Sequence, residues 1–260
     1  MKTEFSIRHP YWAAILVGLL CTLMTATGFA VTKAIGLDDD HSLLVLAAFL
    51  AVSAIIGFMI MKKSRFSLYD YGFRYSEAKS SSKVMFYIPL LVIEVLSIVA
   101  YGFSGEIRPV QYVFTLLFTI SIGFNEEIYF RGLALRYIGE KGIKAAIIWS
   151  SVIFGVLHMA NAFGGQNIGY SLLQVVYAFL VGIVFAEIVS ITKSLWFVIV
   201  WHAAHDFISL LTEGSIETGI IILPVQVALL LFYAIYLWKK HIAQESSITN
   251  STDQQPQMSQ

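Results

Sequence analysis

Eight apolar stretches, each long enough to cross a bilayer as a helix, constrain the fold of this 260-residue chain more than any other feature. They cover residues 11–32, 42–61, 84–103, 111–135, 144–162, 170–190, 194–212 and 218–238. Roughly 20 apolar residues in a helix span the hydrocarbon core. The sequence therefore predicts an all-α, polytopic membrane protein, a bundle of about eight transmembrane helices.

The composition agrees with this class. Hydrophobic residues make up 57% of the chain and charged residues 13%, against about 25% charged in soluble domains. A formal net charge of zero argues against a nucleic-acid partner. The single cysteine, Cys21, excludes an intrachain disulfide, and we interpret it as lipid-facing or as packing. The run 11–31 is too long for a signal-peptide core, so we expect a retained first span.

The basic residues predict the orientation. If the N-terminus is cytoplasmic, 15 of the 17 Lys and Arg residues lie on that side, and the acidic cluster 38–40 lies outside. Both termini are then cytoplasmic. The basic and aromatic loop 62–83 is either an ordinary positive-inside loop or a segment on the anionic inner leaflet. Residues 1–242 form the predicted membrane domain, and 243–260 a disordered polar tail.

Three charges stand at the end of the fourth apolar stretch: Glu126, Glu127 and Arg131. An ionisable group at membrane depth costs from about 2.5 to more than 10 kcal/mol, so it is by default a candidate functional site. Glu127 and Arg131 are four apart and can form an ion pair on one helix face, whereas Glu126 points about 100° away. One carboxylate is therefore held, and the other is free for chemistry.

The six histidines divide into two groups. Three flank the predicted spans and are expected to be solvated: His9, His41 and His241. Three lie inside predicted spans: His158, His202 and His205. Phe154 and His158 are four apart and project together, as do His202 and Asp206. Two polar helices beside an acidic one predict a shared polar site.

These residue types fit the activation of water for attack on a carbonyl group. A carboxylate in apolar surroundings takes a proton from water more readily, so Glu126, helped by His158, is the candidate base. His202 is the candidate donor to the oxyanion, an interaction that lowers the barrier by about 3–4 kcal/mol. Asp206 would hold the His202 ring or donate a proton itself, and Arg131 would brace Glu127.

Zinc is the alternative chemistry. Glu126, His158 and His202 form an acceptable ligand set, although the sequence lacks the His-Glu-x-x-His spacing. Counted from the cytoplasmic ends of their spans, His158 lies at about 21 Å and His202 at about 12 Å. Helix tilt or a late start of the fifth span is needed to bring them to one depth.

At these residues the chain resembles the CPBP intramembrane protease family. That family, also called Abi, includes the CAAX proteases (type II CAAX prenyl endopeptidases) and bacteriocin-processing enzymes. Its Glu-Glu-x-x-x-Arg motif is similar to 126–131, its Phe-x-x-x-His motif to 154–158, and its His-x-x-x-Asn/Asp motif to 202–206. The resemblance covers residues 111–210, which we take as the motif-bearing core.

The resemblance implies an intramembrane endopeptidase for hydrophobic or membrane-associated peptides. Glu126 and His158 would activate water, His202 and Asp206 would form the oxyanion site, and the setting would be a bacterial plasma membrane. The biological role would be peptide maturation, bacteriocin self-immunity or the trimming of prenylated proteins. Asp206 departs from the Asn that is usual in CAAX endopeptidases, and an ionised Asp cannot donate to an oxyanion.

Two other functions stay open. One is an immunity or scaffold protein that binds a peptide on the same fold without cleaving it. The other is a proton-coupled transporter whose path would use Glu126, Arg131 and His202 together with Glu94 and Glu187. The inverted repeats with broken helices that would favour a transporter are not visible in the sequence.

Overall fold

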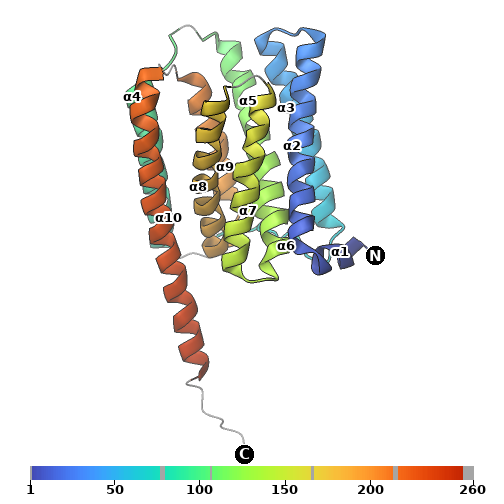
Figure 1. The fold of residues 1–260 in the computed structure, drawn as a ribbon, viewed down its shortest axis with the longest axis vertical. Coiled ribbons are helices and arrows are strands. Elements are labelled where there is room, and N and C mark those ends of the chain that lie inside the picture. The colour runs from blue at the N-terminus through green and yellow to red at the C-terminus, as the bar shows by residue number, and fades with distance from the viewer. Residues whose placement is uncertain (1, 77–79, 106, 165–166, 213–215, 254–260) are drawn as a thin grey trace, which may run out of the picture.

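The structure, a computed structural model, describes residues 2–76, 80–105, 107–164, 167–212 and 216–253. Apart from one isolated bridge between Phe103 and Thr212, the regular elements in these residues are helices. Figure 1 shows them packed side by side. In chain order they are α1 (Lys2–Arg8), α2 (Pro10–Ile35), α3 (Asp39–Lys62), α4 (Ser80–Tyr101), α5 (Pro109–Glu127), the π-helix η1 (Ile128–Ala134), α6 (Leu135–Gly139), α7 (Ile143–Leu157), the 3-10 helix η2 (His158–Gly164), α8 (Ile168–Thr192), α9 (Trp196–Leu211) and α10 (Ile216–Asp253).

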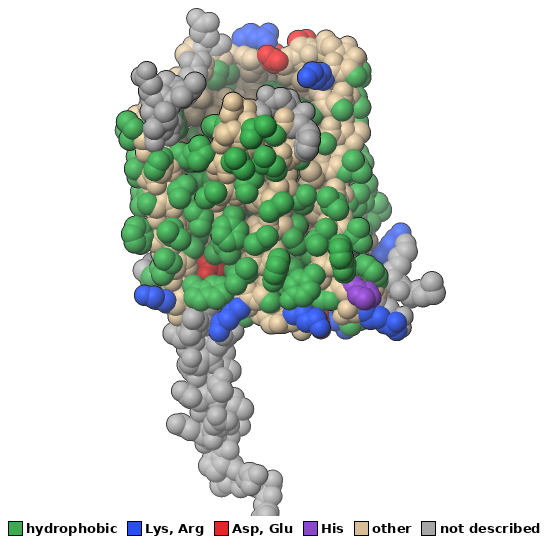
Figure 2. Space-filling view, viewed as in Figure 1, with side chains coloured by type: hydrophobic (Ala, Val, Ile, Leu, Met, Phe, Trp, Pro, Cys, Tyr) green, Lys and Arg blue, Asp and Glu red, His purple; other side chains and the backbone are tan. Residues whose placement is uncertain are grey.

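The bundle has the length and surface of a membrane protein. Among the described residues, six helical segments are long and apolar enough to span a bilayer: Pro10–Ile35, Asp39–Lys62, Pro109–Gly139, Ile143–Ala162, Ile168–Thr192 and Ile221–Lys240. Two shorter apolar helices, Phe86–Tyr101 and Trp196–Leu211, accompany them. Figure 2 shows hydrophobic side chains over the middle of the visible face and Lys and Arg at its two ends. The prediction of an all-α polytopic membrane protein is confirmed.

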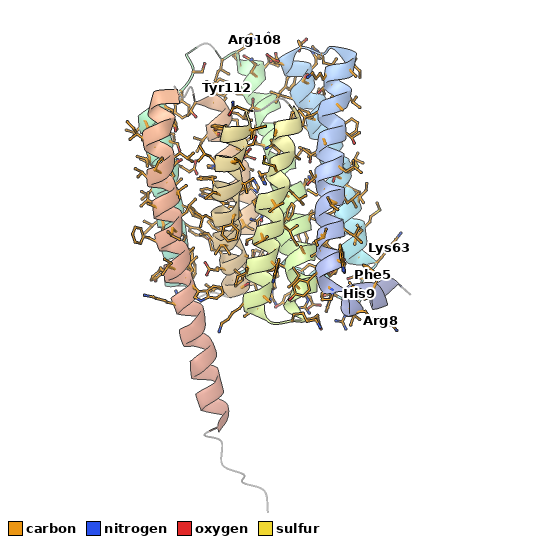
Figure 3. The ribbon with its side chains drawn as sticks, in the orientation of Figure 1. Phe5, Arg8, His9, Lys63, Arg108 and Tyr112 are labelled. Atoms are coloured by element: carbon orange, nitrogen blue, oxygen red, sulfur yellow. The ribbon has the colours of Figure 1, made fainter. Side chains whose placement is uncertain are left out.

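Both ends of the chain emerge at the same end of the bundle (Figure 1). Arg8, His9 and Lys63 lie at this end, and Arg108 lies at the other (Figure 3), where it pairs with Asp40. This arrangement agrees with an even number of spans. One residue in the charge count is placed differently, because Arg131 is buried inside the bundle and is no loop residue.

The loop that follows α3 is attached to the turn that precedes α9. Leu195 N donates to Gly72 O at 2.9 Å, Arg74 Nε donates to Lys193 O at 2.8 Å, and Ser194 Oγ donates to Arg74 O at 2.7 Å. A Cβ on Gly72, whose φ is +97°, would lie 3.0 Å from the Leu195 side chain. The described part of the predicted loop 62–83 therefore fixes the first turn of α9; residues 77–79 lie outside the description.

The last helix packs on α4 and α8. Gln226 Nε2 donates to Ser97 Oγ at 2.7 Å, and Tyr233 Oη donates to Phe86 O at 2.9 Å. The helix then continues beyond the bundle to Asp253 (Figure 1). It thus enters the segment 243–260 that the composition predicts to be disordered, and residues 254–260 lie outside the description. The disorder of this tail stays a prediction.

A glycine allows α5 and α9 to approach each other closely. A Cβ on Gly123 would lie 2.7 Å from Ile199 O and 3.2 Å from Ala203 N. Both neighbours are backbone atoms of α9, so relief would require the whole helix to move. Small residues permit this kind of contact between membrane helices. Gly123 therefore sets the distance between the helix that carries Glu126 and the helix that carries His202.

We expect Gly123→Ala to separate α5 from α9 and to destabilise the protein by about 1–3 kcal/mol, as overpacking does. The melting temperature of the detergent-purified protein measures this. Gly139→Ala is the matched control, because the added Cβ meets no atom within 4 Å. Equal melting temperatures for the two variants would show that the α5–α9 contact tolerates the extra methyl group.

Candidate active site

Glu127 and Arg131 form the predicted ion pair. Arg131 Nη1 donates to Glu127 Oε1 at 2.9 Å, and the exposed fractions of the two side chains are 1% and 0%. The guanidinium also lies over the rings of Phe154 and Phe185, with its Cζ 4.0 and 5.1 Å from their centroids. These cation–π contacts help a buried cation that has lost its hydration. The brace that the spacing predicts is thus present in the structure.

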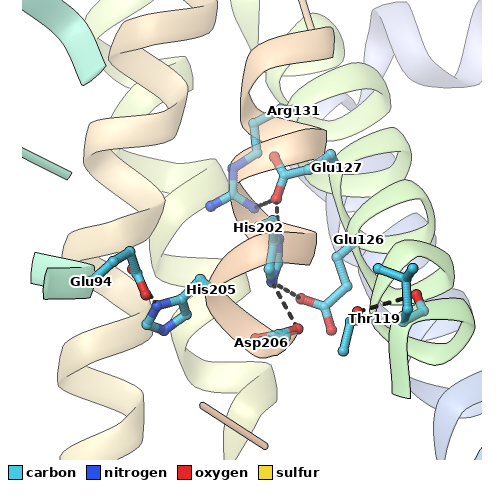
Figure 4. Close-up of polar contacts among 9 residues, drawn as sticks. Glu94, Thr119, Glu126, Glu127, Arg131, His202, His205 and Asp206 are labelled. Atoms are coloured by element: carbon cyan, nitrogen blue, oxygen red, sulfur yellow. Dashed lines mark hydrogen bonds and ion pairs between the residues drawn. The ribbon is translucent and has the colours of Figure 1, made fainter. Parts of the chain in front are cut away.

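The same carboxylate holds His202. Glu127 Oε1 lies 2.7 Å from His202 Nδ1, so one oxygen serves both Arg131 and the imidazole (Figure 4). An ionised carboxylate only accepts, so the Nδ1–H donates. From the spacing, Asp206 is expected either to hold this ring or to donate a proton itself; the contact with Glu127 is not predicted. Because α5 and α9 are far apart in sequence, residue spacing carried no signal for this contact.

The other ring nitrogen of His202 faces two further carboxylates. His202 Nε2 is 3.7 Å from Glu126 Oε2 and 3.7 Å from Asp206 Oδ2, longer than hydrogen bonds. The side chains of Glu126 and Asp206 are 18% and 26% exposed, whereas Glu127 is fully buried. The imidazole therefore separates a closed, charge-paired side from a side that outside groups can reach.

His158 lies near this group without bonding to Glu126. It follows the end of α7, its Nδ1 is 2.8 Å from Phe154 O, and no hydrogen bond or ion pair joins it to Glu126. The Phe154 ring links the two imidazoles, with its centroid 4.5 Å from that of His158 and 6.3 Å from that of His202. The imidazoles of His158 and His202 therefore lie beside the same Phe154 ring, although residue counting places them at different depths in the membrane.

The geometry bears on the zinc alternative. Among the described residues there is no cluster of three or more His, Cys, Asp or Glu side chains placed to hold a metal ion. As they are arranged, Glu126, His158 and His202 do not fit a ligand set.

The helix changes its winding directly after the two glutamates. Residues 128–134 form a π-helix, a rare form that is frequent at functional sites. Neighbouring side chains fix this segment: Tyr129 Oη donates to Ser53 O at 3.0 Å, and Asn125 Nδ2 donates to Cys21 Sγ at 3.2 Å. Cys21 is buried, so it packs inside the bundle. Its interpretation as a lipid-facing residue is wrong.

A second carboxylate–imidazole pair lies beside the first. Glu94 Oε1 is 2.7 Å from His205 Nδ1 (Figure 4), and the His205 ring stacks on Trp201 at 5.0 Å. Both carboxylate oxygens of Glu187 are buried without a hydrogen-bond partner. Neither Glu94 nor Glu187 is bonded to the Glu126 side chain in the described part of the chain.

We expect Glu127→Gln to destabilise the protein strongly, because it leaves Arg131 as an unpaired buried charge. Breaking a buried pair from one side costs about 3–5 kcal/mol. In Glu127→Gln/Arg131→Met no buried charge is left over, so most of the stability should return. Denaturant titration in detergent measures both variants. A double variant as unstable as the single one would show that the pair contributes by shape and not by charge.

One comparison with known proteins finds a match over the segment that carries these residues. Residues 108–208 match the family described as Rce1-like, type II CAAX prenyl endopeptidase Rce1-like. The match runs from the start of α5 into α9, and it contains Glu126, His158, His202 and Asp206. Among the curated proteins and the solved structures nothing matches. Over this segment the integral membrane protein is similar to the CAAX proteases, and the match supports the resemblance to the CPBP family.

Proposed function

We propose that the protein is an intramembrane endopeptidase that hydrolyses hydrophobic or membrane-associated peptides with water activated by Glu126. The arrangement around His202 supports this most directly: the imidazole is held from behind by Glu127 and faces the partly exposed carboxylates of Glu126 and Asp206. It lies in a segment with the sequence of a CAAX-type protease. The catalytic type proposed is a glutamate base without metal.

The reaction would begin with proton transfer from water to a Glu126 oxygen. The water oxygen then attacks the peptide carbonyl carbon, and the carbonyl π electrons move to oxygen. His202, with Nδ1–H bound to Glu127, would present a protonated Nε2 to this oxyanion. When the tetrahedral intermediate collapses, the C–N bond breaks and Glu126 returns its proton to the leaving amine. A fixed donor of this kind contributes about 3–4 kcal/mol to transition-state stability.

His158 and Asp206 would complete the site. His158 packs on the Phe154 ring that also contacts His202, so it would line the approach to Glu126 and help it to bind water. Asp206 would take part in the oxyanion site if it carries a proton. Substrate chemistry follows from the surroundings, since an apolar bundle admits a hydrophobic peptide more readily than a charged one.

We place the enzyme in a bacterial plasma membrane with both termini in the cytoplasm. The excess of Lys and Arg at the end of the bundle that carries the termini supports this orientation. The biological role proposed is peptide maturation or self-immunity to a bacteriocin. In either role the site would lie nearer the cytoplasmic end of the bundle, because His202 is in the second turn of α9, which starts there.

The test is cleavage of a quenched library of hydrophobic peptides by the detergent-purified enzyme. Glu126→Gln should lower kcat about 10²–10⁴-fold, because it removes the general base. Glu94→Gln is the matched control, a buried carboxylate that contacts a histidine on α9 but not Glu126, and it should keep most of the activity. Equal losses in both variants would favour a proton path spread over the bundle.

A chelator added to the same assay tests metal dependence. We expect unchanged rates in the wild type, since Glu126, His158 and His202 are not arranged as ligands. Loss of activity that zinc restores would overturn the glutamate mechanism. Peptide binding without cleavage by the wild type would support the immunity-scaffold alternative.

Asp206→Asn should retain or raise kcat, because a neutral amide can donate to an oxyanion, whereas an ionised carboxylate repels it. Asp206→Ala should lower kcat, and the peptide assay compares the two. If both variants lose activity equally, the Asp206 carboxylate itself is required, as it would be if it held the charge of His202 across their 3.7 Å separation.

A further inference from the structure

A groove lies between α2 and α3, at the end of the bundle that carries both termini. It encloses about 370 Å³, within the range of about 300–1,000 Å³ that is usual for small-molecule sites. Its floor includes Tyr137 of α6, and none of the residues around His202 lines it. Its walls are apolar and include Leu16, Val17, Ile56, Met59 and Ile60. The groove is therefore separate from the candidate active site.

The groove opens toward the surface that faces lipid. Leu16 is 53% exposed and Met59 45%, and both lie on helices that span the bilayer. From Ile56 to Lys63 the wall follows the end of α3 and its C-cap over seven residue steps, about 10 Å at the rise of a helix. The short helix α1 lies beside the end of α2, and Phe5 contributes to the lining (Figure 3). The opening thus extends from the apolar region to the headgroup level.

The mouth of the groove is basic. Lys63 and Arg65 line it, and no acidic side chain does. Lys63 forms no ion pair with any residue that the structure describes, whereas Arg65 Nη2 lies 3.0 Å from Glu140 Oε1. Arg8 is at the same end of the bundle (Figure 3). A molecule with an apolar body and an anionic head matches both parts of the groove.

We propose that this groove binds one phospholipid with an anionic headgroup. An acyl chain lies between α2 and α3, and the phosphate and headgroup contact Lys63 and Arg65. Juxtamembrane basic residues attract anionic lipids in this way. A free phosphate ion would leave the apolar walls unused, and a zwitterionic lipid would leave the positive charge at the mouth uncompensated. The proposal goes beyond the proteolytic function and does not depend on it.

Native mass spectrometry of the detergent-purified protein tests this with two lipids of identical chains, phosphatidylglycerol and phosphatidylcholine. We expect the first phosphatidylglycerol molecule that binds to do so at least fivefold more tightly than the first phosphatidylcholine molecule. Lys63→Gln should weaken its binding about fivefold, the effect of one basic residue near a charged membrane, and should leave phosphatidylcholine unchanged. Lys33→Gln, an exposed lysine at the opposite end of the bundle, is the control that should change neither lipid. Equal affinities for the two lipids, or no effect of Lys63→Gln, would overturn the proposal.

Leu16→Trp tests the apolar part, because the larger side chain fills the groove. Both lipids should bind at least fivefold more weakly, while Leu19→Trp, 47% exposed on the same helix but outside the lining, should have no effect. If Leu16→Trp raises KM for peptide and leaves lipid binding unchanged, the groove holds substrate and the proposal is wrong. Since Glu126→Gln removes proteolysis without touching this groove, lipid binding and catalysis can fail independently.

Discussion

The structure depends on one buried carboxylate oxygen. Glu127 Oε1 accepts from Arg131 at 2.9 Å and lies 2.7 Å from His202 Nδ1, with no exposed surface on the glutamate side chain. A charge in such a place is stable only when it is paired and hydrogen-bonded. Glu127 pairs with the Arg131 guanidinium and orients the His202 imidazole through the same oxygen. Because Glu127 binds Nδ1 of His202, Nε2 is the nitrogen that faces Glu126 and Asp206.

The rest of the bundle keeps these groups at their distances. Gly123 allows the backbones of α5 and α9 to touch, and the contact between residues 72–74 and 193–195 fixes where α9 begins. Phe154 then fills the space between Arg131, His158 and His202 with one ring. The helix α5, the loop at residues 72–74, the turn at residues 193–195 and the helix α7 therefore all position this site. A shift in any one of these four segments would move His202 or the groups around it.

The sequence predicted the features that depend on local spacing. Runs of apolar residues identified the six spanning segments and the two shorter apolar helices of the described residues. A separation of four residues identified the Glu127–Arg131 pair and the shared direction of Phe154 and His158. It could not predict contacts between helices, such as Glu127 with His202, Asn125 with Cys21, or Glu94 with His205. These depend on how helices distant in sequence are rotated against one another. The π-helix after Glu127 also has no simple sequence signature.

The two ion-pair partners of α5–η1 have a consequence for biosynthesis. Glu127 and Arg131 are on one continuous helical segment, whereas His202 is synthesised 75 residues after Glu127. A lone charged residue is expensive to insert into a membrane. Because both charges of the pair leave the ribosome within a few residues of each other, Glu127 and Arg131 can enter the bilayer as a neutral pair. The Glu127–Arg131 pair thus lowers the cost of inserting its helix into the membrane before Glu127 orients the His202 imidazole.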